Sequence, residues 1–481
     1  MDFTEKNNYT LLADFYEFTM GNGYLENGRA DEIVYFDMFF RSVPDEASYA
    51  IIAGLEPLIE YMENLHFEEE DIDFLRSKGL FSEEFLDYLR NFKFACDVWA
   101  LPEGTVAFPQ EPLVTIRGPV IQAQLLETMV LLTINHQSMI VTKANRIVTA
   151  AQSRPVAEFG SRRAQGYSGA NLGARAAYIG GCSGTANTLA DFQYGVPAKG
   201  TMAHSWVMMF DTELEAFRAY AKVYPDSCLL LVDTYDVLKQ GIPNAITVFN
   251  ELREGGHEPL GIRIDSGDIA YLSKMARQML DEAGFEKVQI MASNSLDEYV
   301  IEDILQQGAR VDSFGVGERL ITSKTDPVFG GVYKLVGTER DGQFIPKIKV
   351  SENVAKITTP GFKNIYRFYD KTNNKALADV ITLHDEVIPE DEYEIFHPLF
   401  TWKRKTLKNY EARPLMKQIY DHGKLVYELP SLEEIRENVQ RELSTFWEEV
   451  KRLRNPHEYI VDLSKPLWKM KDELLAEHSK Q

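Results

Sequence analysis

The sequence is poor in cysteine, in basic residues and in long apolar runs, and each shortage argues against a class of protein. Only 3 of the 481 residues are cysteines and no CxxC pair occurs, which excludes a disulfide framework or a cysteine zinc site, and we assign no metal-ligand set. Lys and Arg number 51 against 73 Asp and Glu, and the net charge of −22 disfavours a nucleic-acid or anionic-membrane partner. No apolar run approaches the roughly 20 residues that span a bilayer, and the first ten residues do not resemble a secretory signal. We therefore expect a cytoplasmic protein.

The composition is otherwise that of a globular protein, with 44% hydrophobic residues. The chain divides by pattern into three regions, 1–130, 131–340 and 341–481. The first mixes helices with β-rich segments such as Ile33–Phe40 and Leu113–Arg117. The last begins β-like and ends in charged amphipathic helices, Ser431–Arg454 and Lys465–His478.

The middle region alternates short β-branched or apolar runs with longer helical patterns. This alternation predicts parallel strands joined by right-handed crossovers, either in a barrel or in a doubly wound sheet, because periodicity does not separate the two. The predicted strands are Pro155–Phe159, Ala198–Ala203, Cys228–Asp233, Pro259–Asp265, Lys287–Ala292, Val311–Gly315 and one near Gly331–Leu335. The predicted helices include Leu125–Ala151, Thr212–Tyr224, Tyr235–Glu254, Gly267–Ala283 and Leu296–Gln307.

Chemically active residue types follow these predicted strands, at the end where parallel α/β proteins carry their sites. Each type has a structural alternative, since glycine permits a tight turn and Ser or Asp caps a helix. Structural use alone, however, would spread such residues over both ends of the strands. Gly315 and Gly317 would let backbone N–H groups approach a phosphate, and Arg162 and Arg263 offer bidentate donors. Asp265 could hold ribose hydroxyls or a hydrated Mg²⁺, so we predict a phosphorylated substrate.

Long, ordered motifs in the chain resemble the nicotinate phosphoribosyltransferase family. They are Leu11–Met20, Phe39–Arg41, Glu158–Gly166, Gly200–Ser205 and Arg263–Asp268. The resemblance extends over nearly the whole chain and implies an α/β fold. In that fold an irregular α/β barrel (131–340) accompanies a second α/β domain, formed by the N-terminal region (1–130) with C-terminal additions (341–481) that pack on it and on the barrel.

The resemblance also implies an activity. The family makes nicotinate mononucleotide and pyrophosphate from nicotinate and phosphoribosyl pyrophosphate, coupled to ATP hydrolysis with Mg²⁺, in the salvage route to NAD. It implies an ATP-coupled enzyme of the ligase class, assembled as a homodimer whose active sites are shared across the subunit interface.

Several residue roles follow from the same motifs. By the resemblance, His204 would be the histidine that ATP phosphorylates, and a nucleophilic imidazole needs its other nitrogen held by a partner. Asp233 is the candidate partner, although it could equally cap the next helix, and Asp265 is a further catalytic acid. The nicotinate ring would lie between Phe159 and the partner subunit's Tyr16. The remaining predicted site residues are Thr201 and Arg263 for nicotinate, and Arg162, Ser293, Asn294, Gly315, Gly317 and Thr322 for the phosphoribosyl group.

One departure favours the acid over the amide as substrate. Related nicotinamide-using enzymes resemble the chain around Gly181–Thr185 but carry an acidic residue there, whereas this chain has Ser183, which can donate to a carboxylate.

Two other functions stay open. A sugar-phosphate isomerase or aldolase would need a base or a Schiff-base lysine where a strand ends, and Lys199 lies at the start of its predicted strand. A binding protein could retain the fold without catalysis.

Overall fold

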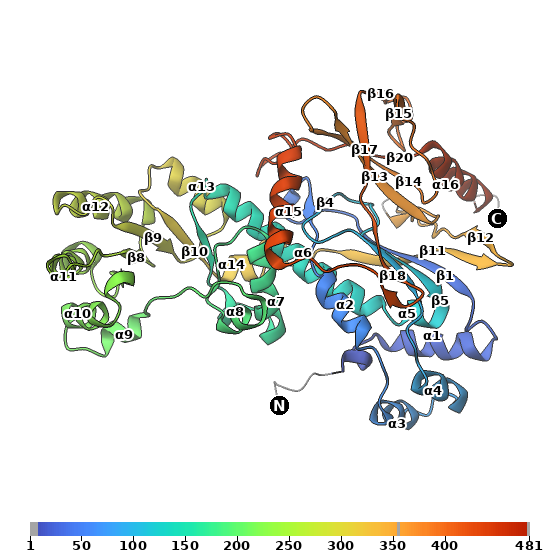
Figure 1. Cartoon of the computed structure of the whole chain (residues 1–481), viewed down its shortest axis with the longest axis horizontal. Coiled ribbons are helices and arrows are strands. Elements are labelled where there is room, and N and C mark those ends of the chain that lie inside the picture. The colour runs from blue at the N-terminus through green and yellow to red at the C-terminus, as the bar shows by residue number, and fades with distance from the viewer. Residues whose placement is uncertain (1–7, 354–355, 479–481) are drawn as a thin grey trace. The chain divides into compact units, whose positions relative to one another are not determined.

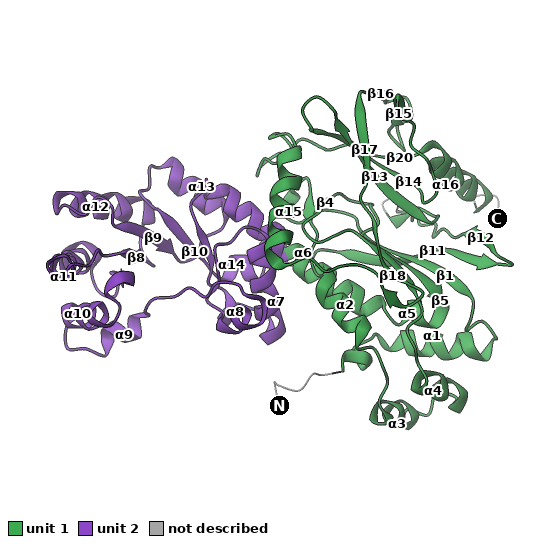
Figure 2. Cartoon of the chain, in the orientation of Figure 1, with its two compact units in different colours: residues 1–139, 328–481 green, residues 140–327 purple. Residues whose placement is uncertain are grey.

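A computed structural model of the chain describes residues 8–353 and 356–478, in two compact units (Figures 1 and 2). Unit 1 comprises residues 1–139 and 328–481, and unit 2 comprises residues 140–327. The N-terminal and C-terminal regions therefore share one unit. Helix α6 (Glu127–Ala150) contributes to both units. Among the described residues, no helix is long and apolar enough to cross a membrane.

Unit 1 is built on a seven-stranded antiparallel sheet with the order β12-β11-β1-β5-β3-β18-β19. The predicted strand Ile33–Phe40 is its interior strand β1, between β11 and β5, and it is buried along nearly its whole length. Its one charged residue, Asp37, pairs with Lys363 at 2.7 Å and accepts a 2.7 Å hydrogen bond from Thr115, so the burial of this charge is compensated. The other strands are β3 (Asp97–Ala100), β5 (Val114–Pro119), β11 (Gly331–Arg340), β12 (Gln343–Pro346), β18 (Lys417–Asp421) and β19 (Lys424–Leu425).

A smaller four-stranded sheet, order β17-β13-β14-β20, also belongs to unit 1. Its strands are β13 (Lys363–Asp370), β14 (Ala376–Leu383), β17 (Tyr410–Pro414) and β20 (Val461–Leu463). The hairpin β15 (Glu392–Phe396) and β16 (Arg404–Lys408) and the pair β2 (Ala50–Ile51) and β4 (Val106–Ala107) complete its strands. Its helices are α1 (Phe15–Glu26), α2 (Leu55–Glu63), α3 (Glu69–Ser77), α4 (Glu83–Arg90), α5 (Val120–Gln124), α15 (Leu432–Thr445) and α16 (Lys465–His478).

Unit 2 contains a parallel five-stranded sheet, order β6-β10-β9-β8-β7, with helices between its strands. The strands are β6 (Val156–Glu158), β7 (Leu229–Leu231), β8 (Gly261–Ile264), β9 (Gln289–Ser293) and β10 (Ser313–Val316). The helices are α7 (Gly166–Ile179), α8 (Thr188–Tyr194), α9 (His204–Met208), α10 (Glu213–Val223), α11 (Ile242–Glu254), α12 (Ile269–Glu282), α13 (Glu298–Gln306) and α14 (Glu318–Ile321). The predicted α/β class is confirmed.

Three details of unit 2 differ from the sequence prediction. The segment 198–203 is not a strand. It makes a single parallel bridge, at Ala198, and it does not pair with β7, so β7 is the last strand on that side of the parallel sheet. The run Gly331–Leu335 is a strand, but it pairs antiparallel with β1 in unit 1, because a short apolar run does not specify which sheet it joins. The expected helix Tyr235–Glu254 begins with a wider π-type turn over Val237–Gly241 before α11.

Candidate active site

Most of the predicted site residues come just after strands of the parallel sheet, at the edge of the sheet where the carboxyl ends of its strands meet. Because β8, β9 and β10 run parallel and pair directly, the residues where they end lie side by side. The Ser293 hydroxyl at the end of β9 donates to the carboxylate of Asp265, which follows β8. The structure thus joins two predicted site residues that are far apart in the sequence.

His204 is the first residue of α9, and its ring contacts residues that follow two neighbouring strands. Its Nδ1 lies 3.1 Å from the hydroxyl of Thr234, which follows β7. Its Nε2 lies 3.9 Å from a carboxylate oxygen of Asp265, and 40% of the side chain is exposed. The imidazole is therefore oriented by a hydroxyl at one nitrogen, faces a carboxylate with the other and is open to a ligand. This arrangement suits a nucleophile.

Asp233 does not hold the imidazole of His204, in contrast to the prediction. Its Oδ2 accepts hydrogen bonds from the Asp265 backbone N–H at 3.1 Å and from the Ser266 hydroxyl at 2.6 Å. Its Oδ1 is buried and has no hydrogen-bond partner in the described part of the chain. The Asp233 side chain thus links the end of β7 to the turn after β8 and positions that turn. The carboxylate beside His204 is that of Asp265.

Arg263 connects β8 to the segment that precedes His204. Its Nη2 donates to the Met202 carbonyl at 2.9 Å, and its Nη1 lies 3.4 Å from the Thr201 hydroxyl. Burial lowers the pKa of Arg263 from its ordinary value, although the charges of Asp265 and Asp233 oppose the shift. Its Nε is buried without a hydrogen-bond partner among residues 8–353 and 356–478.

A second guanidinium lies near Arg263. Arg162, in the turn after β6, is exposed, and its positive charge contributes to lowering the pKa of Arg263. Two cations close enough to repel each other favour an anion between them. A phosphate or carboxylate site between these two arginines stays a prediction.

Phe159 lies half-buried at the same edge and packs against backbone that lacks side chains. A Cβ added to Gly315 would lie 2.5 Å from the Phe159 ring, and one added to Gly317 would lie 3.1 Å from the Phe159 carbonyl oxygen. The ring also packs on Ala157, Leu229 and Met291. Gly315 thus makes room for this aromatic ring and Gly317 for the backbone of Phe159, and the contact of both glycines with a phosphate stays a prediction.

The turn between β9 and α13 has an uncommon backbone conformation. Asn294 has φ 85° and Ser295 has φ 52°, both in the left-handed region that non-glycine residues rarely adopt. Such strain is typical of functional turns. Asn294 therefore stays a candidate for the phosphoribosyl group.

The other predicted residues lie elsewhere or stay untested. Ser183 bonds the Val156 carbonyl through its N–H and its hydroxyl at 2.7 and 3.1 Å, in a segment that runs along β6, and its contact with nicotinate stays a prediction. Thr322 donates its hydroxyl to the Glu318 carbonyl at 2.7 Å, one turn back in the chain. Tyr16 lies on α1 of unit 1 and is 43% exposed, and its contribution to another subunit stays a prediction.

Two structural supports of the site were missed in the sequence. Glu158 is fully buried, which raises the pKa of its carboxyl, and it accepts hydrogen bonds from the Gly160 N–H and from the Thr185 hydroxyl at 2.6 Å. It therefore fixes the turn that carries Phe159. An acidic residue inside the apolar run Val156–Phe159 was the available signal. Thr234 was also missed, although it follows a predicted strand directly.

Comparison with known proteins identifies relatives along the whole chain. Residues 11–135 match the nicotinate phosphoribosyltransferase (NAPRTase) N-terminal domain, residues 155–377 the NAPRTase family, and residues 362–471 the nicotinate phosphoribosyltransferase C-terminal domain. The nicotinate phosphoribosyltransferase of Bacillus subtilis is 42% identical over 469 residues, 97% of this chain and 95% of the relative. That of Caenorhabditis elegans is 35% identical over 522 residues, 95% and 92% of the two chains.

Solved structures agree. Human nicotinic acid phosphoribosyltransferase superimposes with a TM-score of 0.85 at 30% identity, covering 96% of this chain and 99% of that one. A nicotinate-nucleotide pyrophosphorylase from Pyrococcus furiosus has a TM-score of 0.71 at 25% identity, with 92% and 98% coverage.

Proposed function

The chain belongs to the nicotinate phosphoribosyltransferase family, and from that premise we propose that it makes nicotinate mononucleotide and pyrophosphate from nicotinate and phosphoribosyl pyrophosphate. The observation that carries the proposal is the convergence of His204, Asp265 and Arg263 at one edge of the parallel sheet. An imidazole, a carboxylate and a guanidinium that is only partly hydrogen-bonded by the protein together suit the binding of an anionic sugar and the transfer of its phosphoribosyl group. A barrel isomerase or aldolase finds no comparable support.

Substrate binding rests on charge and stacking. The guanidinium of Arg263, held beside Thr201 and Met202, and the exposed guanidinium of Arg162 would bind the nicotinate carboxylate and a phosphate, respectively. The half-buried ring of Phe159 would stack on the pyridine ring, whose nitrogen becomes positively charged as it attacks the anomeric carbon. These contacts orient nitrogen and carbon for displacement of pyrophosphate through an oxocarbenium-like state.

ATP coupling would act through His204. Its imidazole would accept the γ-phosphoryl group of ATP while Thr234 holds Nδ1 and Asp265 faces Nε2. The added negative charge would change the affinity of this edge for phosphoribosyl pyrophosphate, and hydrolysis of the phosphohistidine would then weaken product binding. Binding free energy is thereby shifted between states rather than applied uniformly.

The donor set also fits Mg²⁺, a cation that prefers oxygen ligands. Asp265, with 35% of its side chain exposed, and the Ser293 hydroxyl would hold the ion. When bound, Mg²⁺ would offset the charge of the leaving pyrophosphate.

The assembly and its location are further parts of the proposal. Tyr16 on α1 is 43% exposed, and the neighbouring Phe15 is 46% exposed. Exposed aromatic side chains on one helix are typical of an interface, which supports a homodimer in which Tyr16 reaches the partner's site. We place this enzyme in the cytoplasm, in salvage of nicotinate for NAD.

The test is incorporation of labelled nicotinate into mononucleotide with and without ATP, together with a search for acid-labile phosphate on His204. His204→Ala should lose both the phosphate and the stimulation by ATP, while slow ATP-independent turnover persists. His257→Ala is the matched control, because His257 pairs with Asp226 at 2.7 Å in the same unit but on the exposed surface. Full ATP coupling in His204→Ala would refute the phosphohistidine. Absence of any labelled mononucleotide with the wild-type protein would refute the transferase activity itself.

A further inference from the structure

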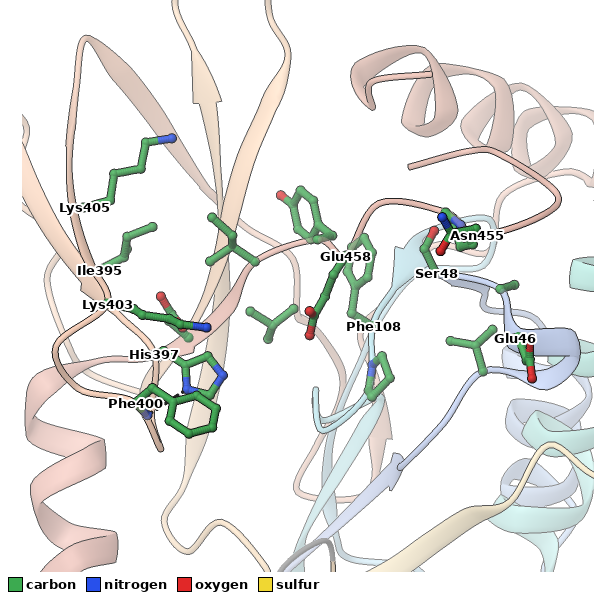
Figure 3. A pocket seen from close by; sticks show the side chains of 18 of the residues that line it. Glu46, Ser48, Phe108, Ile395, His397, Phe400, Lys403, Lys405, Asn455 and Glu458 are labelled. Carbon is green, nitrogen blue, oxygen red and sulfur yellow. Dashed lines mark hydrogen bonds between the residues drawn. The ribbon is translucent and has the colours of Figure 1, made fainter. Parts of the chain in front are cut away.

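Unit 1 contains a pocket of about 950 Å³ (Figure 3). One wall is the β15–β16 hairpin, and the opposite wall comes from the loop after β1, from Phe108 and from the segment that leads into β20. All of its lining residues belong to unit 1. Nothing in the proposed transfer reaction uses them.

A buried carboxylate lines this pocket. Asp462 occupies the middle of β20, where it pairs with Val380, and it is only 5% exposed. Its neighbours Val461 and Leu463 pack into a separate apolar cluster, so the side chain of Asp462 points to the other face of the strand. In the described part of the chain its carboxylate has neither a hydrogen-bond partner nor an ion-pair partner. Burial raises the pKa of Asp462 to about 6, which still leaves it mostly ionised at neutral pH. A largely buried carboxylate that lines the pocket and has no donor from the protein is open to a donor from a ligand.

Two exposed carboxylates extend the acidic character of this side. Glu46 and Glu458 line the pocket on the side away from the hairpin (Figure 3). They are accessible to water, so they set the sign of the local potential rather than a specific contact.

The hairpin wall has the opposite charge. Ile395 and Lys405 are direct cross-strand partners, so their side chains share the face of the hairpin that lines the pocket. Lys403 lies on the same wall, 5.0 Å from the centre of the Phe400 ring. Neither lysine forms an ion pair with any described residue. Nδ1 of His397 accepts the backbone N–H groups of residues 399 and 400 at 3.1 and 3.0 Å, which leaves Nε2 as an N–H donor.

The neighbouring arginine provides a contrast. Arg404 lies between the two lysines in the sequence, yet it pairs with Glu394 at 2.9 Å across the hairpin. The lysines therefore remain without counter-charges while the arginine beside them is neutralised. The hairpin wall is thus a cationic surface whose charges are free to bind an anion.

From this juxtaposition we propose that the pocket binds a guanine nucleotide, with its phosphate on Lys403, Lys405 and the His397 N–H and its base on Asp462. An acceptor-only carboxylate matches the guanine edge, where a ring N–H and an exocyclic amine present two parallel donors. The 43% exposed ring of Phe400 offers an aromatic face to the ligand. The volume of about 950 Å³ accommodates a mononucleotide.

The base contact is tested with nucleotides that differ in one group. Guanosine 5′-monophosphate should bind the intact protein at least tenfold more tightly than inosine 5′-monophosphate, which lacks the exocyclic amine, in isothermal titration calorimetry. Asp462→Asn replaces an acceptor with a donor, and xanthosine 5′-monophosphate replaces the guanine amine with a carbonyl. Asp462→Asn should therefore reverse the preference from the guanosine to the xanthosine nucleotide, an effect that a merely structural role of Asp462 would not produce. An unchanged preference, or no binding of the guanosine nucleotide to the wild type, would overturn the proposal.

The location and the phosphate contact are tested separately. Photolabelling with 8-azidoguanosine 5′-monophosphate should modify peptides containing 395–405 or 455–462, and labelling confined to 140–327 would contradict the proposed site. Lys403→Ala combined with Lys405→Ala should weaken nucleotide binding at least tenfold. Both lysines are exposed, so the variant should fold, and its rate of nicotinate mononucleotide formation should equal that of the wild type. Lys408→Ala is the matched control, because Lys408 lies on the same hairpin outside the pocket lining and pairs with Glu392 at 3.2 Å, and this variant should bind the nucleotide normally.

Discussion

Replacing Gly315 by alanine would test the link between packing at the sheet edge and nicotinate binding. The added methyl carbon would lie 2.5 and 2.6 Å from two carbons of the Phe159 ring, about 1 Å closer than carbon atoms normally approach. The ring must therefore move, and overpacking of this kind costs about 1–3 kcal/mol of folding free energy. If Phe159 stacks on the pyridine ring, its displacement also removes an interaction of about 0.5–1.5 kcal/mol, which raises KM for nicotinate about two- to tenfold.

The assay combines urea denaturation with steady-state kinetics in which nicotinate is varied. Gly23→Ala on α1 is the matched control, because a Cβ at Gly23 meets nothing within 4 Å and alanine favours a helix. Adding Phe159→Leu to Gly315→Ala should recover stability, since the smaller side chain makes room, but should leave KM high. A loss of stability in Gly315→Ala with unchanged KM for nicotinate would refute the stacking role of Phe159. Unchanged stability would refute the close packing.

Two further predictions concern unit 1. Burial raises the pKa of Glu17 from 4.5 to about 7, so between these pH values the folded protein keeps a proton that the unfolded chain has released, and stability falls as pH rises. Glu17→Gln should remove this pH dependence and raise the free energy of unfolding at pH 8 by about 1–3 kcal/mol, and a denaturation profile with the wild-type slope would contradict the assignment. The fully buried Arg367 pairs with Asp379 and Glu442, so Arg367→Met should leave two carboxylates unpaired and cost about 3–5 kcal/mol in urea denaturation. Arg413→Met, at an exposed ion pair, should cost less than about 1 kcal/mol, and equal losses in the two variants would count against the buried network.

The secondary structure of unit 2 was largely predictable because its signals are local. The runs that became β6–β10 are short and apolar and alternate with amphipathic helices, and the polar residues that follow them mark where each strand ends. The run Gly331–Leu335 carried the same local signal, yet it joined an antiparallel sheet in unit 1. Strand pairing depends on partners distant in the sequence, here β1, which no local pattern specifies.

The sequence predicted which residues form the candidate site more reliably than which of them contact one another. Motif and strand position together indicated His204, Asp265 and Arg263, and the structure brings these residues together. The partner of Asp233 was predicted wrongly, because the direction of its side chain is set by the turn after β8. The contact of Ser183 with nicotinate stays a prediction, since its N–H and hydroxyl both bond the Val156 carbonyl in a segment that runs along β6.

The sequence by itself determined which chemical groups the protein has and roughly where along the chain each strand ends, since these depend on residue identity and on the periodicity of short segments. Only the tertiary structure decided which groups meet. Packing placed Thr234 rather than Asp233 against His204, and it left Asp462 without a partner opposite two unpaired lysines. Contacts between residues remote in the sequence arise from the packing of whole elements, and that information is spread over the entire chain.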